Sequence, residues 1–287
     1  MSCDILVIGG GPAGLSAAIN ARARGKSVLV VSNPAEENPL WKSEKIDNYL
    51  GLPGLSGEEL LERFRRHAEQ SGAEFTEGKV LNTALTGDTW YASVGSDVTE
   101  AGAVVLAAGV ARGRKFPGEE TLIGRGVSYC ATCDGMLYRG KAVAVLGFSA
   151  TAEREAEFLR EIGCTVTYFD RPKTCEITGG ERVASVTADG VSADVEGVFI
   201  LRPTVAPADL FPGLAVEKGY ISVDRKMATN LPGLFAAGDC TGGPLQVAKA
   251  VGEGLVAGQS AAAWIDAHRR TRQTENQEPT NSTIKEN

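Results

Sequence analysis

The sequence predicts an α/β protein built from two three-layer domains, each with a parallel sheet. Two stretches of the 287-residue chain, 5–31 and 142–169, each read as a strand, a glycine-containing turn, a helix and a second strand. Glycine is also abundant: 35 of 287 residues is about 12%, against a usual value of about 7%. Tight turns and close backbone contacts in nucleotide-binding domains require glycine. We therefore expect two Rossmann-like, nucleotide-binding-type domains.

The first of these units lies at the start of the chain. The apolar run Ile5–Ile8 predicts a buried strand, and Gly9–Gly14 forms the turn that follows it. Leu15–Arg24 carries apolar side chains on one face and predicts a helix, and Gly25 suits its C-terminal cap. Val28–Val31 is the second strand.

The second unit repeats this order in the middle of the chain. Ala142–Leu146 predicts a strand, Ala150–Ile162 a helix that ends at Gly163, and Thr165–Phe169 the return strand. The segment between the two units contains one more apolar strand, Ala103–Ala107. We therefore expect two separate parallel sheets.

The remaining segments differ in composition. Apolar runs at Val198–Leu201 and Gly233–Ala237 predict further strands, and Ala248–Ala267 predicts a helix. Glu58–Gln70 reads as a charged helix. From Arg269 to Asn287 almost every residue is polar, which indicates a disordered tail.

Composition excludes several classes of function. The net charge of −7, from 29 basic and 36 acidic residues, argues against nucleic-acid binding. No apolar run reaches membrane-spanning length. The N-terminus leads directly into a strand, without a basic region or cleavage site, so we expect no secretory signal and a cytoplasmic location. There, the six cysteines are expected to be free, catalytic or metal-bound rather than a disulfide framework.

The first turn carries a dinucleotide-binding pattern. Gly9 permits the turn, Gly11 lets the backbone approach a pyrophosphate, and Gly14 allows close packing of helix and strand. The alternative is a glycine-rich turn without a ligand. The acid that usually binds a ribose after the second strand is missing, because Ser32 and Asn33 stand there.

A Cys-x-x-Cys motif followed by an acid lies between the two units. Zinc would need a second pair of ligands, but the other cysteines are single and the only histidines are His67 and His268. Two structural thiols are another alternative. Cys130 and Cys133 are best explained as a redox-active dithiol. Asp134 suits a proton donor or acceptor for these sulfurs, although a turn or cap role stays open.

These motifs, in this order, resemble a known family. The sequences GGGPAG at Gly9–Gly14, AAG at Ala107–Gly109, GRGVSYCATCDG at Gly124–Gly135 and GLFAAGD at Gly233–Asp239 are similar to those of the low-molecular-weight thioredoxin reductases. The resemblance extends to about residue 267.

The resemblance implies a discontinuous FAD domain, 1–112 and 206–287, with the tail at 269–287, and an inserted domain at 113–205 that carries the dithiol. It implies reduction of the disulfide of thioredoxin by a homodimer. Cys133 would face the flavin, Cys130 would attack the partner disulfide, and Asp134 would be the acid/base. The implied FAD contacts are Gly9, Gly11, Pro12, Ala13, Gly14, Asn48, Ala108, Gly109, Gly238, Asp239 and Gln246.

The inserted domain departs from the usual family pattern at its nucleotide site. The turn Gly147–Ala152 has Ser149 where the middle glycine is expected, with the bulky Phe148 beside it. Asp170-Arg171-Pro172 replaces a basic cluster, so a 2′-phosphate would meet a like charge. The following segment, 173–197, is also short. We infer that the fold is kept and the dinucleotide site is lost.

This departure resembles the flavin-type ferredoxin-dependent branch of the family, as do three segments around the expected flavin site: Pro39–Trp41, Ile46–Gly51 and Leu245–Val247. Ferredoxin is therefore the favoured electron donor. NADH or NADPH stays open, because Asp170 lies 23 residues after Gly147, where an acid binds the ribose of NAD. A non-catalytic, FAD-binding redox sensor is a further alternative.

The charge balance sets one condition on a ferredoxin donor. Ferredoxins are acidic, and the isoelectric point of this chain is near 5.1. Docking would therefore need a local basic patch. The candidates are Arg112, Arg114, Lys115 and Arg125.

Overall fold

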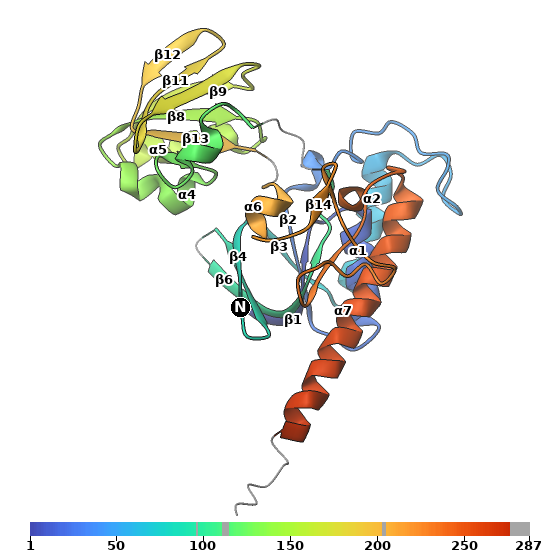
Figure 1. Cartoon of the computed structure of the whole chain (residues 1–287). Coiled ribbons are helices and arrows are strands. Elements are labelled where there is room, and N and C mark those ends of the chain that lie inside the picture. Colours follow the sequence, from blue (N-terminus) through green and yellow to red (C-terminus); the bar gives the residue numbers. More distant parts are fainter. Residues whose placement is uncertain (96, 111–114, 203–204, 276–287) are drawn as a thin grey trace, which may run out of the picture.

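The computed structural model describes residues 1–95, 97–110, 115–202 and 205–275 (Figure 1). Two bodies are visible, one built on a seven-stranded sheet and one on a four-stranded sheet. We call them the seven-stranded part and the four-stranded part. The expected domain boundary at 112/113 lies outside the described residues, as do Arg112 and Arg114.

The seven-stranded sheet has the order β3-β2-β1-β6-β5-β4, and β16 also pairs with β6. Strands β1, β2, β3, β6 and β16 run parallel, whereas β4 and β5 form an antiparallel extension. Strand β16 comes from far along the chain, so both ends of the sequence contribute to one sheet. The bounds are Ser2–Ile8 for β1, Val28–Ser32 for β2, Glu74–Glu77 for β3, Val80–Thr86 for β4, Thr89–Val94 for β5, Asp97–Leu106 for β6 and Leu234–Ala236 for β16.

Three helices cover this sheet: α1 (Pro12–Arg22), α2 (Gly57–Gln70) and α7 (Val247–Glu275). Small residues let α1 and α7 pack closely. A Cβ atom added to Gly254 would lie 2.1 Å from the carbonyl oxygen of Ala13, so a larger residue there would separate the helices. Figure 1 shows α7 extending beyond the body.

Helix α7 extends into the C-terminal segment that the sequence predicts to be disordered. The helix continues to Glu275, so the first part of 269–287, which the sequence suggested was a disordered tail, is helical. The packed part of α7 already forms the helix, so polar residues can extend it without a new nucleation cost, and composition alone does not show this. Residues 276–287 lie outside the described residues.

The four-stranded sheet has the order β7-β13-β8-β9, with all strands parallel. The short segment after β9 folds into an antiparallel sheet of β10, β11 and β12. The strand bounds are Val127–Ser128 for β7, Ala142–Gly147 for β8, Thr165–Asp170 for β9, Cys175–Gly179 for β10, Val183–Ala188 for β11, Val191–Asp194 for β12 and Gly197–Leu201 for β13. The helices are α3 (Glu119–Leu122), α4 (Ala131–Asp134), the 3-10 helix η2 (Gly135–Tyr138) and α5 (Ala152–Glu161).

Short elements complete the seven-stranded part: η1 (Ala35–Glu37), α6 (Pro207–Leu210), β14 (Val216–Glu217), β15 (Tyr220–Ile221) and η3 (Asp239–Thr241). The predicted α/β fold is confirmed, with a parallel four-stranded sheet and a seven-stranded sheet that is parallel except for β4 and β5. Within the described residues, no helix combines the length and apolar character needed to cross a membrane.

Candidate active site

The turn between β1 and α1 needs glycine for steric reasons. Gly9 has a φ of 116°, and a Cβ atom there would lie 2.3 Å from the carbonyl oxygen of Ala107. A Cβ atom on Gly14 would lie 1.9 Å from the carbonyl oxygen of Gly9. Gly11 is the N-cap residue of α1, and no side chain caps the helix. The first N–H groups of α1 are therefore available to an anion.

A cavity of about 520 Å³ opens beside this turn. Most of the expected FAD contacts line it: Gly9, Gly11, Pro12, Ala13, Ala108, Gly109, Gly238, Asp239 and Gln246. Gly14 lies behind the turn, and Asn48 adjoins the cavity by donating a 2.7 Å hydrogen bond to Gln246 Oε1. Ser32 and Asn33, which replace the usual ribose-binding acid, also line the cavity. A glycine cradle at a helix N-terminus fits the pyrophosphate of FAD.

Several cavity residues had not been assigned from the sequence. They come from three places in the chain and share no motif: Glu37 with its neighbour Asn38 at the end of η1, Arg65 on α2, and Lys79 between β3 and β4. Nothing in their spacing could have identified them.

A polar network holds the Gly238 side of the cavity. Glu253 Oε2 accepts hydrogen bonds from the N–H of Gly238 (2.9 Å) and from Thr241 Oγ1 (2.8 Å). Lys249 pairs with Glu253 at 3.0 Å and donates to the carbonyl oxygen of Gly238 at 2.7 Å. The network fixes a turn whose glycine has a positive φ of 88°. These two charged residues, one helical turn apart on α7, were missed at the sequence level.

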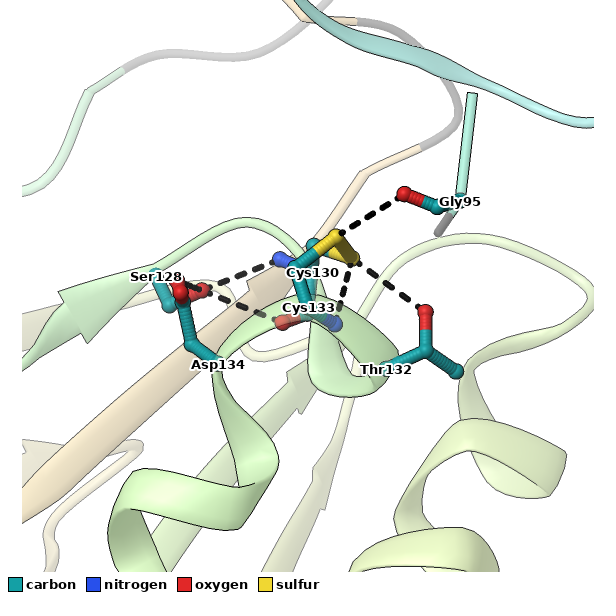
Figure 2. The surroundings of a disulfide bond; sticks show 6 residues. All are labelled: Gly95, Ser128, Cys130, Thr132, Cys133 and Asp134. Atoms are coloured by element: carbon teal, nitrogen blue, oxygen red, sulfur yellow. Dashed lines mark hydrogen bonds between the residues drawn. A yellow bond between two sulfur atoms is a disulfide. The ribbon is translucent and has the colours of Figure 1, made fainter. Parts of the chain in front are cut away.

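Cys130 and Cys133 are joined by a disulfide at α4, with Cα atoms 5.4 Å apart (Figure 2). Cys130 is the N-cap residue, and its Sγ accepts a 3.1 Å hydrogen bond from the N–H of Cys133. Thr132 Oγ1 lies 3.3 Å from the same sulfur. Cys130 is buried, whereas Cys133 is exposed and its Sγ lies 3.8 Å from the carbonyl oxygen of Gly95.

Asp134 is connected to the disulfide through Ser128. The hydroxyl of the buried Ser128 donates a 2.7 Å hydrogen bond to Asp134 Oδ2, and its oxygen accepts from the N–H of Cys130 at 3.1 Å (Figure 2). The carboxylate is thus held at a defined place beside the sulfur-bearing turn. Ser128 had not been singled out from the sequence.

The disulfide and the cavity are separate in this arrangement. Neither Cys130 nor Cys133 is among the residues that line the cavity. Gly95, which faces the disulfide, belongs to the turn between β5 and β6 in the seven-stranded part. The disulfide therefore contacts the seven-stranded part at the tip of a hairpin.

The other four cysteines are poor nucleophiles. Burial raises the pKa of Cys3 and of Cys175 to about 11 and that of Cys240 to about 12. Burial also raises the pKa of Cys164. Among the described residues, no group of histidine, cysteine and acidic side chains is suited to hold a metal ion. Thiol chemistry is therefore concentrated at the Cys130–Cys133 pair.

The second nucleotide-type turn, between β8 and α5, carries a bulky aromatic side chain. Phe148 stacks on Phe116 with ring centroids 5.8 Å apart, and the guanidinium of Arg202 lies 5.3 Å and 5.8 Å from the Phe116 and Phe148 ring centres. Ser149 is buried, with its Oγ 3.2 Å from Thr151 Oγ1. Phe116, Phe148 and Arg202 thus form a packed cluster beside the turn, which we call the plug.

Arg202 is anchored by a fully buried acid. It contacts Glu119 through two hydrogen bonds, of 2.5 Å and 2.9 Å. Tyr129 and the N–H of Phe116 also donate to this carboxylate, each at 2.9 Å. Burial alone would raise the pKa of Glu119, but Arg202 and the other donors bring it below its usual value. Glu119 is therefore a charged anchor for the plug.

Asp170, the acid considered for NAD, ends β9. It lies opposite Gly147 in the parallel register of β8 and β9 and is exposed. A Cβ atom on Gly147 would lie 2.2 Å from the hydroxyl of Tyr168. A larger residue at Gly147 would therefore require Tyr168 to move, independently of any nucleotide.

Comparison with known proteins agrees with this geometry. The sequence profile of the pyridine nucleotide-disulphide oxidoreductase family matches residues 3–204 and 171–254. A thioredoxin reductase of Listeria innocua is 32% identical over 92% of this chain and 94% of its own length. A ferredoxin-flavin thioredoxin reductase from Clostridium acetobutylicum has a TM-score of 0.88 and 37% identity, and the match covers 94% of this chain and 99% of that one. A thioredoxin reductase from Gloeobacter violaceus has a TM-score of 0.81 and 27% identity, over 93% and 95% of the two chains.

The profile match covers both sheets, and the relatives align over nearly the whole chain. The glycine cradle is suited to hold a flavin, and the disulfide is a second redox group in the same chain. The chain therefore belongs to the pyridine nucleotide-disulphide oxidoreductase family, as a flavoprotein disulfide oxidoreductase related to the thioredoxin reductases, with FAD as its cofactor.

Proposed function

We propose that this protein reduces the disulfide of thioredoxin with electrons from ferredoxin. Relatives named thioredoxin reductase support the substrate, and the ferredoxin-flavin enzyme of similar structure supports the donor. One observation carries the choice of donor. The plug of Phe116, Phe148 and Arg202 places a bulky side chain, Phe148, in the turn where a pyridine dinucleotide would bind.

Charge at this turn also disfavours a dinucleotide. Glu37 accepts a hydrogen bond from the N–H of Ala150 at 2.9 Å, and Glu153 and Glu155 lie in the first turn of α5. Three carboxylates thus surround the helix N-terminus that would receive a pyrophosphate. Asp170 adds a fourth negative charge at the end of β9, where a 2′-phosphate would lie.

A one-electron protein donor needs no such pocket. FAD, when bound, accepts electrons one at a time and passes a pair to a disulfide. The glycine cradle of Gly9 and Gly11 and the N-terminus of α1 would hold its pyrophosphate, and Asn48 with Gln246 would lie at the cavity edge. An acidic ferredoxin also requires local positive charge. Lys115 does not supply it, because it pairs with Glu120 and Asp209 at 2.9 Å each.

The dithiol would carry out the exchange with thioredoxin. The thiolate of Cys130 attacks one sulfur of the partner disulfide, and Cys133 then attacks the mixed disulfide, so that the pair is oxidised and thioredoxin is released with two thiols. The N–H of Cys133 is placed to stabilise a thiolate on Cys130. Asp134, held by Ser128, would take and return the proton. Since Cys130 is buried here, thioredoxin can reach it only if its surroundings move.

The assignments that go with this function are also proposals. Residues 1–112 and 206–287 would form the FAD domain, and residues 113–205 the inserted dithiol domain. The enzyme would act as a cytoplasmic homodimer.

A second candidate donor is NADH. The exposed Asp170, opposite Gly147, is placed to bind a ribose hydroxyl. This reading requires the plug around Phe148 to move aside. It predicts that Asp170→Ala would abolish reduction by NADH.

Anaerobic stopped-flow spectroscopy tests the donor directly. The flavin-loaded protein is mixed with reduced ferredoxin, with millimolar NADPH or with NADH, and the oxidised flavin band is followed. We expect bleaching at the rate of thioredoxin turnover with ferredoxin alone. The variant with serine at both Cys130 and Cys133 is the control, because its flavin should still bleach while thioredoxin is not reduced. Rapid bleaching by NADPH would contradict the proposal, and bleaching by NADH alone would favour the second candidate.

A further inference from the structure

A carboxylate of the seven-stranded part lies at the beginning of helix α5 in the four-stranded part. Glu37 ends the 3-10 helix η1, and its Oε1 accepts a hydrogen bond from the N–H of Ala150 at 2.9 Å. Ala150 directly precedes Thr151, the N-cap residue of α5. The two residues are 113 positions apart in the chain. This contact therefore joins the two parts of the molecule.

The place that Glu37 occupies is suited to an anion. N–H groups at the start of a helix lack backbone partners and lie at the positive end of the helix dipole. In a nucleotide-binding turn a phosphate takes this place. Here a carboxylate from elsewhere in the chain supplies the negative charge.

A second contact joins the same two parts. Lys79, between β3 and β4, donates from Nζ to the carbonyl oxygen of Arg202, directly after β13. Burial holds the pKa of Lys79 below its usual value, and the nearby carboxylates of Glu155 and Glu37 offset this effect only in part. Lys79 and Glu37 both line the flavin cavity. The cavity wall is thus tied to the four-stranded part at two points.

We propose that Glu37 and Lys79 form a clasp that holds the two parts in this arrangement and keeps the Cys130–Cys133 disulfide away from the flavin cavity. Neither cysteine lines the cavity, and Cys133 faces Gly95 instead. The inference rests on the proposed passage of electrons between FAD and the disulfide, because that passage requires the two to meet. Opening of the clasp therefore controls when the reduced flavin can reduce the Cys130–Cys133 disulfide.

The clasp predicts that Glu37→Ala loosens this arrangement in the flavin-loaded protein. Nitroxide labels at Glu58→Cys on α2 and Glu176→Cys on β10, in a Cys3→Ser background, report the distance between the parts by pulsed EPR. Both label sites are exposed. The parent should give one dominant distance. Loss of a partly exposed, charge-assisted hydrogen bond should raise the population of other distances about fivefold.

Two variants serve as controls. Glu36→Ala removes the same charge from the exposed neighbouring residue of η1 and should keep the distance distribution of the parent. Glu37→Gln retains an accepting oxygen without the charge and should give an intermediate distribution. Flavin absorbance checks FAD occupancy, because Glu37 lines the cavity. If Glu37→Ala loses FAD, the clasp is tested instead by comparing the distance distribution of Glu37→Gln with that of the parent.

A kinetic measurement supplies the second readout. The flavin is photoreduced without any protein donor, and new thiols at Cys130 and Cys133 are trapped with a maleimide at set times. Glu37→Ala should form them about fivefold faster than Glu36→Ala, in line with the change in population. If the distances and rates of Glu37→Ala match those of Glu36→Ala and the parent, the clasp is wrong. A failure of ferredoxin as donor would leave both measurements unaffected.

Discussion

Replacing Arg202 by leucine should strongly destabilise the four-stranded part, because it leaves Glu119 as a buried charge without its main partner. The side chain of Glu119 has no exposed surface, and that of Arg202 is only 13% exposed. Two charge-assisted hydrogen bonds are lost, and the N–H of Phe116 and the hydroxyl of Tyr129 are the donors that remain. Removing one partner of such a buried pair costs about 3–5 kcal/mol.

This cost can be measured by thermal unfolding of the flavin-loaded protein, followed by far-UV circular dichroism. For a unit of this size each kcal/mol lowers the Tm by roughly 4–8 °C, so Arg202→Leu should lower it by about 12 °C or more. The double variant Arg202→Leu with Glu119→Gln should recover at least half of the loss, because it removes the uncompensated charge. Arg160→Leu is a control, since its pair with Glu157 is exposed and should contribute under about 1 kcal/mol.

The loss of stability in Arg202→Leu should also depend on pH. In the parent, the pKa of Glu119 is lowered on folding, so its contribution to stability is present above its unfolded pKa and is lost as the pH falls through its folded pKa. In Arg202→Leu, burial is no longer opposed by the guanidinium, and the carboxyl becomes protonated at higher pH. The deficit should therefore be smaller at pH 5 than at pH 8. An equal deficit at both pH values, or a double variant no more stable than Arg202→Leu, would refute the reasoning.

Three further predictions concern the two redox centres. Gly11→Val should lose most bound FAD, because a Cβ atom there would already lie 3.1 Å from Asn38 Nδ2 and the branched side chain would enter the pyrophosphate site. The ratio of flavin absorbance to protein measures this loss, and full FAD occupancy would contradict the assignment of the site. Cys133→Ser should trap thioredoxin as a stable mixed disulfide on non-reducing gels, whereas Cys130→Ser should not; the opposite pattern would reverse the two roles. Asp134→Asn should slow thioredoxin reduction by roughly 10²–10⁴-fold if it is the acid/base, without loss of FAD. An unchanged rate would leave it only a structural partner of Ser128.

Local patterns in the sequence were sufficient to predict the parallel strand–helix–strand unit in each of the two sheets. A strand of apolar residues, a glycine turn and an amphipathic helix depend on neighbours within a few positions, so β1–α1 and β8–α5 could be read directly. The Gly9–Gly14 pattern and the Cys-x-x-Cys spacing carry their chemistry in the same local way. Strands β4, β5 and β10–β12 were not predicted, because their half-exposed residues show no clear apolar run.

What the sequence determined by itself is the presence of a glycine cradle, a dithiol and a degenerate second turn. Which side chains complete each of these was decided only by the tertiary structure. Glu119 meets Arg202 across 83 residues, and Glu37 meets the backbone N–H of Ala150 across 113. No spacing rule links residues so far apart. Such pairs form because folding buries a charge or exposes a helix N-terminus, and the partner that satisfies it is whichever polar group the packed elements bring within hydrogen-bond distance.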